Sequence, residues 1–166
     1  MSEVVAINFS DTLPDISAKN IEFTFSDSAL VQIRISGPQM NAVEGDDPYM
    51  EFPQGFLVQF YDSAFNITST ITGEYGVHYA DKKIMEARNN VVVTNYETGE
   101  RLDTEELIWD QKKKIIYSYK FVKITSDEGV IFGDTLIADQ DFSKRSIKNT
   151  SGEIEVKDEE EEMINE

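Results

Sequence analysis

The sequence predicts an all-β fold, an elongated antiparallel sandwich built from repeated strand–turn–strand units. Apolar and polar residues alternate with a period of two in segments 21–25, 31–35 and 56–60, as in half-buried strands. Turn sequences such as SGPQ, FPQG and NYETGE separate the apolar segments at short intervals. No window shows the 3.6-residue periodicity of an amphipathic helix. Together these observations favour a sandwich over any fold that contains helices.

Further strands are expected along the rest of the chain, at 75–79, 84–87, 91–95, 107–109, 115–119, 121–125, 130–132 and 136–138. The segment LDTEEL is ambiguous, because Thr104 offers a helix cap. Ile108 and Trp109 run from it directly into a lysine-rich turn, so we predict a strand there.

A weak repeat supports this layout. The segments EYGVHYADKK, TEELIWDQKK and DTLIADQDFSK align at a period of roughly 30 residues, each followed by an apolar strand. In this alignment Tyr79, Trp109 and Ala138 are equivalent, and each precedes a cationic turn. Such units cannot bury a face alone, so they should stack side by side into an elongated sandwich.

The length of 166 residues allows one domain with a real core. We expect an extended arm over 1–14, the β domain over 15–156 and an acidic disordered tail over 157–166, where charges crowd together. The net charge of −17 opposes binding to nucleic acid. No apolar run reaches the roughly 18–20 residues of a membrane span, so we expect either a soluble protein or a sequence that begins after an anchor.

Catalytic and metal-binding patterns are sparse. The chain has no cysteine, and its one histidine, His78, is predicted to lie on the polar surface. The acid pairs Asp46-Asp47 and Glu105-Glu106 are sequence neighbours, which point to opposite faces of a strand. GDTLIADQD lacks the spacing of a calcium loop, and no nucleotide-binding motif is present. We therefore predict no enzyme activity, metal or cofactor, although two acids from separate strands could still form a hydrolase pair.

Alternation assigns a set of large apolar residues to the inner face. Two interpretations are open: a dry sandwich core, or an unclosed interior that holds an acyl chain. The candidate lipid-contacting residues are Phe23, Phe25, Ile33, Phe56, Val58, Phe60, Tyr75, Tyr79, Leu107, Trp109, Val122 and Ile124.

The cationic turns likewise allow two interpretations. They could form a solvated edge that discourages aggregation, or a stripe that contacts the phosphates of a bound amphiphile. The residues concerned are Lys82, Lys83, Lys112, Lys113, Lys114, Lys144 and Arg145.

Several long segments of the chain are distinctive in combination. They are EARNNVVVTNYETGERLDTEELIWDQKKKIIYS, FVKIT and GVIFGDTLIADQDFSKRSIKNTSGEI, preceded by LPD and FPQGFLVQFYD. Together, over most of 13–154, they resemble the LptC family in its YrbK-like branch. The resemblance implies a twisted, open β-jellyroll without catalytic activity. It also implies a periplasmic protein tethered to the inner membrane through an anchor outside this sequence.

The resemblance further implies transport of lipopolysaccharide. The protein would accept it from the LptBFG transporter and pass it to LptA through edge-strand pairing, with the lipid A acyl chains inside the jellyroll. Trp109 would then be an apolar wall of the lipid site. Exposed edges also predict a weak homodimer.

One alternative keeps the same strands but a different function. A carbohydrate-binding or adhesin-like β-sandwich would have a dry core and an outer aromatic platform. Its platform residues would be Tyr49, Tyr61, Tyr96 and Tyr117.

Overall fold

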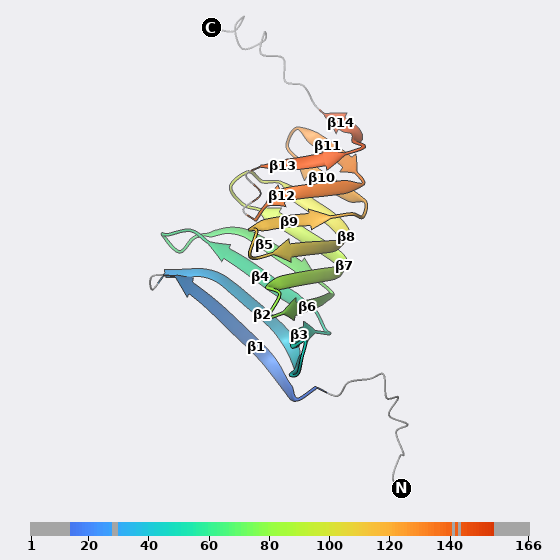
Figure 1. Ribbon diagram of the computed structural model, residues 1–166. Coiled ribbons are helices and arrows are strands. Elements are labelled where there is room, and N and C mark those ends of the chain that lie inside the picture. Colours follow the sequence, from blue (N-terminus) through green and yellow to red (C-terminus); the bar gives the residue numbers. More distant parts are fainter. Residues whose placement is uncertain (1–13, 28–29, 141, 143, 155–166) are drawn as a thin grey trace, which may run out of the picture.

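The computed structural model describes residues 14–27, 30–140, 142 and 144–154, and all regular secondary structure among them is β-strand (Figure 1). The strands are β1 (Ile16–Asp27), β2 (Leu30–Val43), β3 (Tyr49–Phe52), β4 (Phe56–Tyr61), β5 (Ile67–Gly73), β6 (Tyr75–Tyr79), β7 (Ile84–Asn95), β8 (Arg101–Asp110), β9 (Ile115–Ser118), β10 (Val122–Ser126), β11 (Gly129–Gly133), β12 (Thr135–Asp139), β13 (Arg145–Lys148) and β14 (Ser151–Ile154). All pairings are antiparallel. The predicted all-β class is therefore confirmed.

One continuous sheet folds over itself into two layers, because β2, β7 and β8 each pass from one layer to the other. Residues 84–88 of β7 pair with β6, whereas 92–95 pair with β5. The ladder between β7 and β8 shifts register between Arg88 and Val91, where Asn89 and Asn90 adopt positive φ angles of 64° and 50°. Asparagine tolerates this left-handed conformation better than most residues, so the sequence favours a bend at this point.

We call the two layers sheet I and sheet II. Sheet I contains β3, β6, β9, β12, β13 and the adjoining halves of β7 and β8. Sheet II contains β4, β5, β10, β11, β14 and the other halves. β2 belongs to both sheets, because its residues 33–36 pair with β4 and its residues 41–43 pair with β3, and β1 pairs along the length of β2. Figure 1 shows the β1–β2 pair at one end of the molecule, and β13 and β14 at the other.

The connections divide the jellyroll into two unlike long sides. On one side, the spine, the chain crosses between layers at 52–56, 73–75, 118–122, 133–135 and 148–151, and β7 and β8 bend. On the other side, the seam, hairpin turns of sheet I (79–84, 110–115 and 139–145) lie opposite hairpin turns of sheet II (61–67, 95–101 and 126–129). No strand pairing in the described part of the chain joins the layers across the seam.

Several strand predictions were wrong in detail. SGPQ, predicted as a turn, lies within β2, and segments 84–87 and 91–95 form the single bent strand β7. Pro38 is tolerated because β2 pairs with β4 only up to Ser36 and with β3 only from Asn41. The strands β3, β5, β13 and β14 were not predicted, since they are short or polar. Residues 1–13 and 155–166 lie outside the described residues, so the arm over 1–14 and the tail over 157–166 stay predictions.

Candidate functional site

The space between the two sheets is lined by apolar side chains that face one another. Residues paired in antiparallel strands project to the same face, so the strand pairings identify the inward rows. In sheet I one inward row is His78, Met85, Trp109, Ile116 and Ala138. In sheet II it is Val58, Ile71, Val93, Leu102 and Ile124. These rows belong to one core that runs along the molecule.

Most of the residues assigned to the inner face do lie there. Seven are at most 7% exposed and share the core, namely Phe56, Val58, Phe60, Leu107, Trp109, Val122 and Ile124. Phe23 and Ile33 are partly buried and pack against this core. Phe25, at the far end of β1, is 41% exposed. Alternation alone therefore found the walls of sheet II and of β8.

The assignment of Tyr75 and Tyr79 to the inner face was wrong. The inward residues of β6 are Gly76 and His78, which pair with Ala87 and Met85 of β7. A Cβ on Gly76 would lie 2.6 Å from a ring carbon of Phe56, so glycine makes room for that core ring. His78 is 8% exposed and is not the surface residue that was predicted.

The error came from aligning the first repeat one residue out of register, which exchanges the faces of a strand. In the structure Lys83 is equivalent to Lys114: both have positive φ angles, 52° and 55°, and each carbonyl accepts a bond from the next turn. The partners are Gln111 N at 3.0 Å and Gln140 N at 3.1 Å. The second turn carries one more lysine than the first, which misled the alignment.

The side chains of Gln111 and Gln140 also hydrogen-bond to the inward-facing rings of the first two repeats. His78 Nε2 lies 3.0 Å from Gln111 Oε1, and Trp109 Nε1 donates to Gln140 Oε1 at 3.2 Å. The Trp109 ring also meets Phe60 of sheet II edge to face, with 5.3 Å between centroids. Trp109 thus joins the two sheets beside the seam.

The interior between the sheets is closely packed. Among the described residues, small cavities of about 10 Å³, next to Trp109 and Phe56, and about 20 Å³, next to Phe142 and Ile124, lie within it. Such volumes hold at most about one water molecule. An acyl chain can therefore occupy this interior only if the two sheets move apart.

The seam has two lips of unlike charge. The turns of sheet I carry the predicted cationic residues, and all their lysines are exposed. Lys82 pairs with Asp47 at 3.2 Å and lies over the ring of Tyr79. The turns of sheet II carry carboxylates instead, at Asp62, Glu97, Glu100, Asp127 and Glu128. The stacked arrangement of the sheet I turns is now established, whereas their contact with phosphates stays a prediction.

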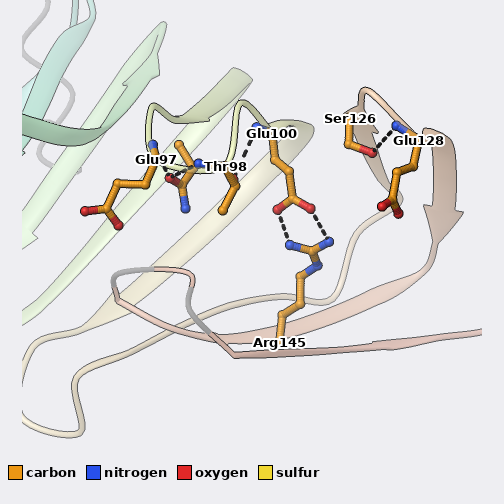
Figure 2. A network of polar contacts seen from close by, with 7 residues as sticks. Glu97, Thr98, Glu100, Ser126, Glu128 and Arg145 are labelled. Carbon is orange, nitrogen blue, oxygen red and sulfur yellow. Dashed lines mark hydrogen bonds and ion pairs between the residues drawn. The ribbon is translucent and has the colours of Figure 1, made fainter. Parts of the chain in front are cut away.

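One ion pair crosses the seam and was not predicted. Glu100 lies in the turn between β7 and β8, and Arg145 lies at the start of β13. Both terminal nitrogens of the Arg145 guanidinium, Nη1 and Nη2, donate to the Glu100 carboxylate, with 2.6 Å between Nη2 and Oε1 (Figure 2). The two residues are 45 positions apart. No local pattern in the sequence signals such a contact.

The four tyrosines of the proposed aromatic platform do not share one face. Tyr49 and Tyr117 lie on the outer face of sheet I, where Tyr49 pairs with Tyr79. Tyr61 and Tyr96 belong to sheet II, near its hairpin turns. On the outer face of sheet I, burial and a hydrogen bond to Glu51 raise the pKa of Tyr75 to about 12.

The residues that the structure describes contain no cluster of three or more His, Cys, Asp or Glu side chains able to hold a metal ion. Among them there is also no helix with the length and apolar character needed to cross a bilayer.

The comparisons with known proteins bear on the whole jellyroll. Residues 9–149 match the family described as lipopolysaccharide-assembly, LptC-related. A search of curated proteins gave no match. The matched residues include every strand from β1 to β13 and hence both walls of the interior. The chain therefore belongs to the LptC-related family of lipopolysaccharide-assembly proteins.

Proposed function

We propose that this protein is a non-enzymatic conduit that holds the acyl chains of lipopolysaccharide between sheet I and sheet II. It accepts the lipid from LptBFG and passes it to LptA. The observation that carries the proposal is an apolar interior, continuous along the jellyroll, whose walls are joined by strands at the spine but not at the seam.

Separation of the sheets at the seam would admit the chains. The interactions that close the seam are few, and the charged groups on its lips are mostly exposed. Exposed ion pairs contribute only about 0–1 kcal/mol each. Acyl chains would cover the apolar side chains that opening exposes, and such burial stabilises by about 25 cal/mol per Å².

The net charge of −17 argues against long-range attraction of an anionic glycolipid. The cationic turns are confined to the sheet I lip of the seam. Phosphate groups would therefore stay at this lip, in solvent, while the chains lie inside. Transfer by contact between neighbouring proteins suits this arrangement better than capture from solution.

The ends of the jellyroll offer edges for such contacts. Among the residues that the structure describes, β1 pairs only with β2, β13 only with β12, and β14 only with β11. Free edges of this kind accept a further strand by β-augmentation. We assign one end to LptBFG and the other to LptA in the periplasm, with the protein tethered to the inner membrane. The same edges would allow a weak homodimer.

Bromine on an acyl chain quenches tryptophan fluorescence at contact, and Trp109 is the only tryptophan. A chain-brominated dodecyl phosphate, added below its micelle-forming concentration, is expected to quench Trp109 strongly. The matched control carries Trp109→Phe and Ile108→Trp, which moves the indole to the outer face of the same strand. Equal quenching of both proteins, or of neither, would contradict a lipid-lined interior.

A further inference from the structure

The Glu100–Arg145 pair is the ion pair of the described residues that bridges sheet I and sheet II across the seam. In Figure 2 the Glu100 side chain descends from the turn after β7, and Arg145 rises to meet it from β13. The side chains are 20% and 27% exposed, so water still reaches the pair. A partly exposed pair can exchange partners.

Arg145 differs from the other cationic residues of the lip in its position. In the ladder between β12 and β13, Arg145 lies directly opposite Ala138, and the row of Ala138 continues across the sheet through Ile116 to Trp109. Arg145 thus lies on the inward row of sheet I, at the last strand before the open end. Lys144, by contrast, lies in the preceding turn and not on β13.

The end of the interior beside Arg145 is hollow. A pocket of about 400 Å³ is lined by Ile131 of sheet II, Ile147 of sheet I, Arg145 and residues 150–152. Arg145 also borders the cavity of about 20 Å³, which Phe142 and Ile124 line from the core. Arg145 therefore lies between the open pocket of about 400 Å³, which we call the mouth, and the packed interior.

We propose that Arg145 binds the phosphomonoester headgroup of the lipid at this mouth, and that Glu100 occupies the same guanidinium until the headgroup displaces it. This inference rests on the proposed function and names its headgroup contact. Exchange of the carboxylate for a phosphate removes the bridge between the sheets, so headgroup binding and opening of the seam are one event.

The chemistry of the pair selects this ligand. A guanidinium holds carboxylate and phosphate oxygens in the same bidentate geometry, and a phosphomonoester carries more charge than a carboxylate. Glu97 and Glu128 lie on the sheet II lip near Glu100 (Figure 2). They repel every anion near the pair, phosphate included, so a ligand must gain from Ile131 and Ile147 as well as from Arg145. A phosphate joined to an alkyl chain satisfies both requirements.

The test compares dodecyl phosphate with dodecyl maltoside, which has the same chain and a neutral head, using Trp109 fluorescence in the full chain. The ratio of the two affinities isolates the headgroup. We expect Arg145→Gln to lower the preference for phosphate about tenfold and Glu100→Gln to raise it severalfold. Lys144→Gln is the matched control, expected to leave the ratio almost unchanged.

An unchanged ratio in both Arg145→Gln and Glu100→Gln overturns the inference. Should Arg145→Gln fail to fold, Glu100→Gln, which keeps the cation, decides alone. Displacement of dodecyl phosphate by an equal concentration of inorganic phosphate would show a free-anion site and also overturn it. Failure of the proposed function looks different, since neither dodecyl compound would then change Trp109 fluorescence in the unaltered protein.

Discussion

Trp109→Ala is expected to lower the free energy of unfolding by about 3–5 kcal/mol, the range for tryptophan truncation in a core. Trp109 is 3% exposed, packs on Phe60 across the interior and donates to Gln140. Domains of this size are stable by roughly 5–15 kcal/mol, so a large share of the stability would be lost. The variant should unfold at a clearly lower urea concentration.

Trp109→Phe is the matched control, because it keeps an aromatic ring against Phe60 and removes the Gln140 bond. Its loss of stability should be well below that of the alanine variant. The measurement is urea unfolding followed by circular dichroism, since the fluorescent residue itself is changed. An alanine variant as stable as the unaltered protein would show that the two sheets are not packed at this point.

A covalent bridge across the seam is expected to abolish loading of acyl chains, with a fall in affinity of more than about tenfold. The chain has no cysteine, so Glu100→Cys with Arg145→Cys gives one addressable pair. A short bis-maleimide joins the two thiols and holds the sheets together at the open end. Beyond the mouth beside Arg145, the cavities of about 10 and 20 Å³ in the packed interior are too small for a chain. Binding is read from Trp109 fluorescence on titration with dodecyl maltoside.

The same double variant before bridging is the control, together with each single cysteine treated with the reagent. All three lack the ion pair but can open, so they should bind at least as well as the unaltered protein. If the bridged protein loads normally, chains must enter from the ends of the jellyroll and not through the seam.

Local patterns were sufficient for part of this structure. Alternation in β4 placed Phe56, Val58 and Phe60 in the core, because a strand with one buried face leaves a period-two record in its residues. The prediction of a strand at LDTEELIWD was also confirmed, since β8 covers it. In both places the pattern of residues within a single strand was enough to predict the strand.

Other features depend on contacts that no local pattern records. Which residues of β6 face inward follows from its register against β7. A one-residue slip in the sequence alignment therefore predicted His78 outward and Tyr79 inward, the reverse of the structure. β5 is rich in threonine and serine and gave no alternation, yet it is a central strand of sheet II. The Glu100–Arg145 pair arises only because the sheet folds over itself at Asn89 and Asn90.

Site-specific photocrosslinking to lipopolysaccharide tests most directly whether the interior carries lipid. The probe is placed at Phe60 or Trp109 on the inner face, and at Gln59 or Asp110, their outward neighbours. Adducts at the two inner positions and none at the outer ones are the expected result. Adducts at the outer positions, or none anywhere in folded protein, would contradict a conduit whose acyl chains lie between the sheets.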